Sequence, residues 1–389
     1  MNLLLYAIFL LILVLLYFLL KSLEQNLVIT IICSLIIIQI VLTPKLCIDS
    51  ALLGANLFIN RVFPSLFPFL VVTSIMMDYN GVHIYSKFFG KILCKPLRLP
   101  LSCTFVLIVS MLCGYPLGAK YACELYEQEV IDYKTCERLV NIASNASPLF
   151  VIGAVGTSML KNSNIGYLLL ISNYISCFIM ALIITQKDIH KKNSLNGLRT
   201  VPSKNIGNII KNSIENSIKT CLSIGGFVIL FSVLTNIIKN NLFFNIIIEK
   251  ITNLLSIDKN ILEGFILGLI EITNGCYLIS TTSKSMYIKA IIISFFLGFS
   301  GLSIISQVYS FTYKHNLSLK KYTIRKVLQG FICSTITLIL YRISLPKIAI
   351  QTSNIKTNTN LWSSLLITCI IILIIPFLFN KLKKLFYTS

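Results

Sequence analysis

The chain has 389 residues, of which 56% are hydrophobic and 12% are charged, and its mean hydropathy is +0.83. Soluble domains carry about 25% charged residues, so this composition excludes a soluble globular domain and predicts a polytopic integral membrane protein. A formal net charge of +20 would suggest a nucleic-acid partner in a soluble chain. Here the basic residues lie mainly between apolar runs, which the positive-inside rule and anionic membrane lipid explain, and no nucleic-acid-binding motif is present.

Nine apolar runs reach or approach the ~20 residues that a membrane-spanning helix needs. In chain order they are 3–20, 27–43, 56–77, 139–160, 165–185, 206–238, 288–312, 325–343 and 361–379. No basic residue precedes the first run and no small-residue cleavage site is present, so we expect a retained span and not a signal peptide.

Basic loops decide the orientation of two further apolar segments, 101–119 and 261–283. These loops are 83–100, 186–219, 313–326 and the C-terminal tail, and the positive-inside rule places all four in the cytoplasm. A full span at 101–119 would put the first two loops on opposite sides. We therefore expect a re-entrant hairpin that turns at Gly114-Tyr115-Pro116 and a second one that turns at Asn274-Gly275. The expected topology is nine spans and two hairpins, with the N-terminus outside and the C-terminus inside.

The two halves of the chain match element by element, which predicts an internal repeat. In each half a span precedes an amphipathic surface helix, a hairpin, a broken span and a further span. The expected parts are peripheral helices in 1–49, a first repeat 50–185, a basic cytoplasmic linker 186–205, a second repeat 206–345, and an outer loop with a last helix in 346–389. The repeats begin on opposite sides of the membrane, so their topology is inverted, as in several secondary transporters. The predicted fold is thus an all-α polytopic membrane protein.

Proline and glycine interrupt two spans at membrane depth, at Asn145-Ala146-Ser147-Pro148 and at Gly298-Phe299-Ser300-Gly301. In hydrocarbon, freed backbone groups cost several kcal/mol each unless protein buries them or a cavity wets them. One such break is most simply a packing kink. Two breaks in corresponding places of two halves indicate a transporter site near the bilayer midplane.

Glu271 is the one acidic residue that the sequence places firmly at membrane depth, which makes it a functional candidate. It could hold a coupling proton, accept a hydrogen bond from substrate, or form a structural ion pair. Lys120 is a suitable partner if both hairpin tips meet; alternatively, Lys120 snorkels to the cytoplasmic headgroups. A lysine in the cavity would favour an anionic substrate, as would half-helix N-termini at Ser147 and Ser300.

The candidate substrate-binding residues supply hydroxyl, amide, charged and backbone groups around the turns and breaks. They are Gly114, Tyr115, Pro116, Lys120, Asn141, Asn145, Ser147, Glu271, Thr273, Asn274, Gly275, Ser300, Gly301, Ser303 and Gln307. Nothing in the sequence resembles a nucleophile with an adjacent base, a phosphate-binding loop or a metal-ligand cluster. We therefore expect no enzymatic activity, no metal and no cofactor, and homo-oligomerisation is left open.

Three stretches form an ordered set of motifs. They are Pro64-Ser-Leu-Phe-Pro-Phe69; Gly114-Tyr-Pro-Leu-Gly-Ala-Lys120 with Arg138-Leu-Val-Asn141 and Ser144-Asn-Ala-Ser-Pro-Leu-Phe150; and Leu297-Gly-Phe-Ser-Gly-Leu-Ser303 with Gln307-Val-Tyr309. Together they resemble the YlbJ family of sporulation integral membrane proteins, over roughly residues 50–345. The resemblance implies a gate type of domain similar to concentrative nucleoside transporters. It also implies a place in the mother-cell membrane around the forespore and a role in moving dipicolinate toward the spore.

Three hypotheses for the function follow. The leading one is a transporter or facilitator for a small organic anion, which the resemblance identifies as dipicolinate. This planar dianion fits Lys120 and the helix N-termini, and it requires Glu271 to be protonated or paired. The gate type of domain alone would favour a nucleoside or nucleobase permease. The third hypothesis is a non-transporting assembly factor of the spore envelope.

Overall fold

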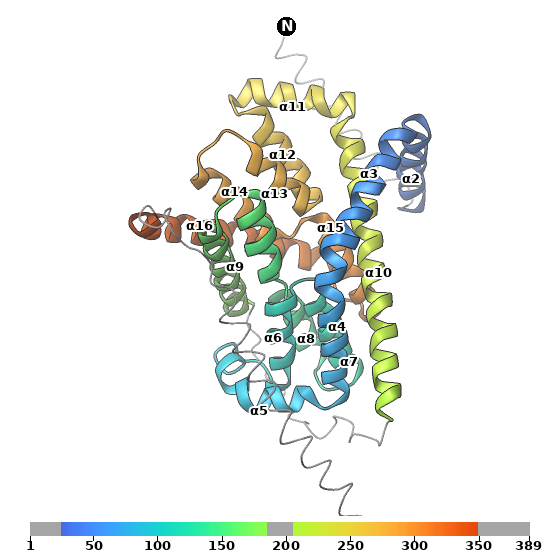
Figure 1. Cartoon of the computed structure of the whole chain (residues 1–389), viewed down its shortest axis with the longest axis vertical. Helices are drawn as coiled ribbons and strands as arrows, with labels where there is room; N and C mark the ends of the chain where they lie inside the picture. The colour runs from blue at the N-terminus through green and yellow to red at the C-terminus, as the bar shows by residue number, and fades with distance from the viewer. Residues whose placement is uncertain (1–24, 185–204, 349–389) are drawn as a thin grey trace, which may run out of the picture. The chain divides into compact units, whose positions relative to one another are not determined.

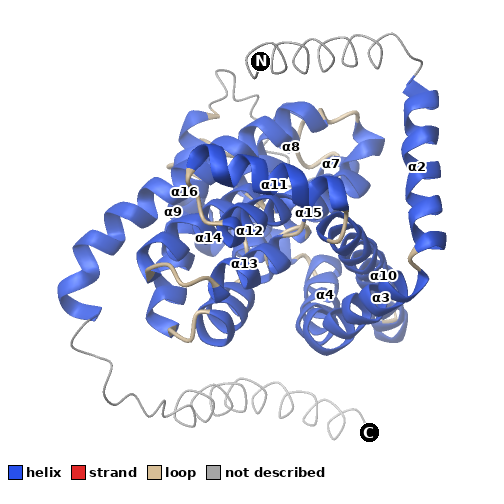
Figure 2. Ribbon diagram, turned by 90° about the horizontal axis from the view of Figure 1, so that it is seen from above, coloured by secondary structure: helices blue, strands red, loops and turns tan. Residues whose placement is uncertain are grey.

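The computed structural model describes residues 25–184 and 205–348, and within these ranges every regular element is a helix (Figures 1 and 2). The spans expected at 3–20 and 361–379, the outer loop and nearly all of the linker 186–205 lie outside the described residues. The chain divides into two compact units, Met1–Tyr341 and Arg342–Ser389. The site described below belongs to the first unit.

Four described helices are long and apolar enough to cross a bilayer, as the composition predicted. They are α9 (Ser163–Ile183), α10 (Ile206–Lys239), α14 with α15 (Met286–Phe299 and Gly301–Thr312, counted as one crossing) and α16 (Leu319–Ile348). A fifth crossing results if α2 (Gln25–Leu42) and α3 (Pro44–Leu57), which are bent by 102°, count as one span. A helical membrane protein is thus confirmed, whereas the total of nine spans stays a prediction.

α3 continues through a π-helix, η1 (Phe58–Val62), into α4 (Phe63–Asp78), and this long segment packs along α10 (Figures 1 and 2). Glycine permits the contact at two places. A Cβ at Gly225 would lie 2.7 Å from the Phe58 ring, and a Cβ at Gly54 would lie 2.9 Å from Ser232 Cβ. Lipid supplies no hydrophobic drive for helices to associate, so close backbone approach at small residues is the usual way in which membrane helices pack.

The expected surface helices are present as α5 (Gly81–Leu93) and α11 (Leu242–Leu255), which lie at opposite ends of the first unit and across the direction of α10 (Figure 1). Each leaves a row of large apolar side chains exposed: Phe88 is 70% and Ile92 is 71% exposed on α5, and Phe243 and Leu254 are both 76% exposed on α11. Such faces suit the two boundaries between hydrocarbon and headgroups.

Shorter helices fill the space between these ends. The first half contributes η2 (Leu101–Cys103), α6 (Thr104–Cys113), α7 (Leu117–Glu127), α8 (Tyr133–Ile142) and the π-helix η3 (Leu149–Met159). The second half contributes α12 (Lys259–Ile270), α13 (Ile272–Thr281) and the single turn η5 (Tyr313–His315). The core of the unit is here, since Phe105, Tyr121 and Phe296 are among its largest fully buried side chains.

Candidate functional site

The first hairpin turns at Gly114-Tyr115-Pro116, between α6 and α7, and its tip lies against the first helix break. Tyr115 N donates to Asn145 O at 2.7 Å, and Asn145 Nδ2 donates back to Ser110 O of α6 at 3.1 Å. Gly114 has φ +79°, and a Cβ there would lie 2.5 Å from Ser147 N. The hairpin tip therefore satisfies backbone groups that the break between α8 and η3 leaves free.

The second hairpin turns at Glu271, so the predicted turn at Asn274-Gly275 is wrong. Glu271 is extended (φ −137°, ψ 116°), and its carboxylate accepts from Thr273 N at 3.0 Å and from Asn274 N at 2.7 Å. This carboxylate is the N-cap of α13, which starts the helix before Asn274. Gly275 instead lies within α13, where a Cβ would clash with Gly268 Cα of α12, so it allows the two arms to touch.

The second break lies against this second tip. Ser300 separates α14 from α15, whose first residue is Gly301, and both residues have positive φ angles, +79° and +78°. A Cβ at Gly301 would lie 3.3 Å from Ile272 N and 3.4 Å from Gly268 O. In each half, then, a hairpin tip contacts the helix break of the same half.

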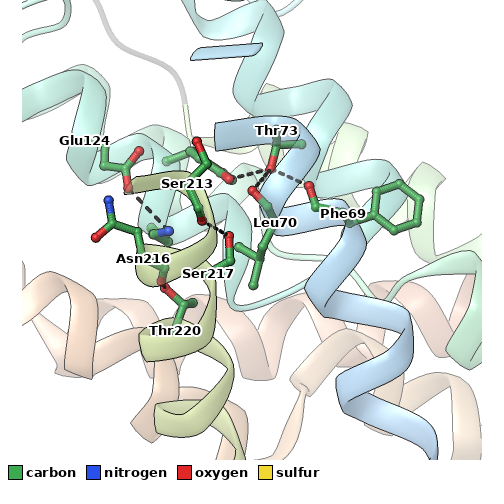
Figure 3. Close-up of polar contacts among 10 residues, drawn as sticks. Phe69, Leu70, Thr73, Glu124, Ser213, Asn216, Ser217 and Thr220 are labelled. Atoms are coloured by element: carbon green, nitrogen blue, oxygen red, sulfur yellow. Dashed lines mark hydrogen bonds and ion pairs between the residues drawn. The ribbon is translucent and has the colours of Figure 1, made fainter. Parts of the chain in front are cut away.

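The structure pairs Lys120 with Glu124 and not with Glu271. Lys120 Nζ lies 3.5 Å from Glu124 Oε1, one turn further along α7, and the lysine side chain is 14% exposed. The neighbouring Tyr121 hydroxyl shares a 2.5 Å hydrogen bond with Thr73 of α4. Figure 3 shows this region, where α4 and α7 meet the hydroxyl-bearing face of α10 that carries Ser213, Ser217 and Thr220. A local partner at i+4 has thus replaced the long-range pairing.

Lys326 is a buried cation that the sequence interpretation missed. The basic loop 313–326 was expected in the cytoplasm, yet Lys326 lies about two turns inside α16 and is only 1% exposed. Its Nζ donates to Ser144 O in the first break and to Gln329 Oε1, both at 2.8 Å, and lies 5.7 Å from the centroid of the Tyr115 ring. Ser144 Oγ also shares a 2.7 Å hydrogen bond with the Tyr322 hydroxyl.

A helical pattern could have revealed this face of α16. Tyr322, Lys326, Gln329 and Cys333 recur at i, i+4, i+7 and i+11, and all are buried. Lys320 and Lys321 are exposed. Because the basic cluster was interpreted as a loop, the polar residues spaced along one helix face were not recognised as such.

Several candidate residues are buried with polar atoms that have no partner in the described ranges. Asn141 Oδ1, Gln307 Oε1, the Ser300 hydroxyl and the Tyr115 hydroxyl are of this kind. The other amide atoms are used: Asn141 Nδ2 donates to Glu137 O at 2.7 Å, and Gln307 Nε2 lies 3.4 Å from Ser303 Oγ. Pro116 is buried at the first tip, and Ser147 Oγ accepts from Phe150 N at 3.3 Å. Buried polar atoms are normally satisfied, so within the described residues these atoms have unused capacity for a ligand or water.

A small cavity lies beside Asn141. It is lined by parts of α8, α15, α16 and the connection before α16: Glu137, Val140, Asn141, Val308, Thr312, Leu317, Ser318, Leu319 and Tyr322. Ion pairs join its walls, because Glu137 Oε1 lies 3.1 Å from Arg325 Nη1 and 4.0 Å from Lys321 Nζ. Glu137, Arg325 and Lys321 thus form a charged clasp next to the unpaired Asn141 oxygen.

Comparison with known proteins gives one clear relative. No family model and no solved structure matches the chain. The chain is 27% identical over 328 residues to the sporulation integral membrane protein YlbJ of Bacillus subtilis (strain 168), and the match covers 77% of this chain and 78% of that protein.

Proposed function

We infer the function of this chain from the premise that it belongs to the YlbJ family of sporulation integral membrane proteins, as its motifs predicted. A membrane role in sporulation follows from that relationship and from the apolar helices. We propose that the chain is a transporter or facilitator for a small organic anion, with dipicolinate as the candidate substrate. Its proposed location is the mother-cell membrane around the forespore.

The observation that carries this proposal is the contact of each hairpin tip with a helix break, Tyr115 with Asn145 in one half and Ile272 with Gly301 in the other. In a membrane, non-helical backbone persists only where protein buries it or where it lines a wet cavity. Discontinuous helices placed in two corresponding halves form the substrate sites of many secondary transporters. The same element order in both halves supports the proposed inverted repeat, nine spans and two re-entrant hairpins.

An anionic substrate has support from the first break as well as from the family resemblance. The π-helix η3 begins at Leu149, directly after the break, and its N-terminal N–H groups point toward the break and the hairpin tip that lies on it. Helix N-termini favour negative groups because their N–H donors are free and the peptide dipoles add. Within the described residues Ser147 Oγ caps only one of these donors, Phe150 N.

A second candidate function, a nucleobase or nucleoside permease, has one observation in its favour. The amide oxygens of Asn141 and Gln307, which are buried and have no partner among the described residues, are hydrogen-bond acceptors. A neutral planar heterocycle with N–H donors would satisfy such acceptors, whereas a carboxylate would repel them. The two candidates therefore differ in the charge of the substrate.

Flux through the purified full chain in liposomes tests the proposal, with labelled dipicolinate and labelled uridine in parallel and protein-free liposomes as the control. Saturable dipicolinate flux supports the anion transporter. Uridine flux without dipicolinate flux supports the permease. Absence of both fluxes, with protein shown to be folded by its thermal unfolding transition, contradicts transport and favours an assembly factor.

A further inference from the structure

Lys326 carries a charge for which the described part of the chain offers no counter-charge. Its two acceptors, Ser144 O and Gln329 Oε1, are neutral oxygens, and no described carboxylate lies within 4.0 Å of its Nζ. An ammonium group has three N–H donors, so one of them has no acceptor among the described residues. A buried charge without a partner is strongly unfavourable, and ionisable groups at membrane depth are normally paired or functional.

The contrast with the preceding turn of the same helix is informative. Arg325 and Lys321 lie closer to solvent, and both have Glu137 as their partner. Lys326, which is 1% exposed, has none among the described residues. Among the described residues of α16, Arg325 and Lys321 therefore have a carboxylate partner, whereas the more deeply buried Lys326 has none.

A structural role explains only part of this arrangement. Ser144 O is freed by the break after α8, and a donor must satisfy it. A neutral amide would do so equally well and without the cost of a buried charge. The hydrogen bond therefore accounts for a donor at this position, and the ammonium charge needs another cause.

The surroundings of Lys326 Nζ indicate the chemistry of the missing partner. The Tyr115 ring lies 5.7 Å from it, at the tip of the first hairpin, and the Tyr322 hydroxyl bonds to the same Ser144. Cys177, which accepts from Gln329 Nε2 at 3.0 Å, and Cys333 are the other titratable groups on this face, and both are buried free thiols. An ammonium donor beside an aromatic face suits a carboxylate attached to a planar ring.

The cavity described above lies close to Lys326. Tyr322 lines that cavity and lies one turn before Lys326 on α16. Asn141, whose side chain is 4% exposed and whose Oδ1 has no partner in the described ranges, lines it from α8. The cavity thus lies one helical turn from Lys326 along α16.

We propose that Lys326 is the substrate-binding cation of this protein and that it pairs with one carboxylate of a planar aromatic carboxylate whose ring lies against Tyr115. This inference rests on the proposed transport of a small organic anion and assigns its site. Lys326 replaces Lys120 as the candidate substrate-binding cation, because Glu124 already compensates the charge of Lys120.

The test measures binding of pyridine-2,6-dicarboxylate and of pyridine-2-carboxylate to the purified full chain. Lys326→Gln keeps N–H donors and removes the charge, and we expect it to weaken dicarboxylate binding at least about tenfold. Lys326→Arg should retain most of the affinity. Lys320→Gln, an exposed lysine on the same helix, is the matched control and should bind as the wild type does. Unchanged affinity in folded Lys326→Gln would overturn the assignment.

A second variant keeps the inference testable if Lys326→Gln does not fold. Gln329→Glu places a carboxylate where an amide oxygen now lies 2.8 Å from Lys326 Nζ. We expect this internal partner to raise the thermal stability of the protein and to compete with the substrate, so that dicarboxylate affinity falls about tenfold or more. Gln329→Glu that binds dicarboxylate like the wild type would contradict the proposal.

The outcomes separate this inference from the proposed function. If the wild type transports dipicolinate and neither variant alters that flux, the proposed transport function stands and Lys326 is not part of the substrate site. Absence of both binding and flux in the wild type refutes the transport proposal and this assignment with it.

Discussion

Gly114 closes the first hairpin with φ +79° and ψ −173°, a backbone conformation that is essentially restricted to glycine. Alanine at this position would carry a strain of about 1–3 kcal/mol. Its Cβ would also lie 2.5 Å from Ser147 N and 3.1 Å from Asn145 O, which are backbone atoms and cannot rotate away. The tip must therefore shift from the break, which removes the 2.7 Å hydrogen bond from Tyr115 N to Asn145 O at a cost of about 1 kcal/mol.

We expect Gly114→Ala to lower the free energy of unfolding by about 2–4 kcal/mol and to abolish flux. Gly226→Ala is the matched control, because this exposed glycine in α10 has no atom within 4 Å of an added Cβ. It should be neutral or stabilise by up to about 1 kcal/mol. The assay is thermal unfolding of the purified proteins in detergent, followed by flux in liposomes. A Gly114→Ala protein as stable and as active as Gly226→Ala would refute the proposed contact between tip and break.

Three further predictions concern the second hairpin, the charged clasp and the topology. Glu271→Ala should cost about 1 kcal/mol of stability through loss of the α13 N-cap, and Glu271→Asp should recover most of it in the same unfolding assay. Exchanging the two charges, Glu137→Arg with Arg325→Glu, should restore the stability that each single substitution loses. A coupling free energy below about 0.2 kcal/mol in this double-mutant cycle would show that the charged clasp is not formed. Single cysteines at Gln128 and Ser283, both exposed, should react from opposite sides of the membrane, and reaction from one side would contradict the inverted repeat. The native Cys123 and Cys136 are buried and are unsuited to this labelling.

The positions of the breaks and of the first turn could be predicted because they depend on local chemistry. Gly114 and Pro116 both disfavour a helix interior, and Pro148 restricts the residue before it. The apolar faces of α5 and α11 likewise followed from the spacing of their side chains. The second turn was misplaced because Asn274-Gly275 is a common turn pair, whereas the capping carboxylate of Glu271 started a helix through both residues.

The sequence by itself determined that this protein is helical and lies in a membrane, and that it contains two hairpins and two broken helices, because length, hydropathy and helix-breaking residues act over a few turns of chain. Tertiary structure alone decided which tip lies on which break and which lysine is buried. Lys326 and Ser144 are 182 positions apart. Lys120 and Lys326 are alike as isolated side chains, and they differ only because folding places Glu124 beside one and no described carboxylate beside the other. The i+4 spacing alone offered Glu124 as the partner of Lys120, whereas the contact of Lys326 with Ser144 O depends on a distant part of the chain.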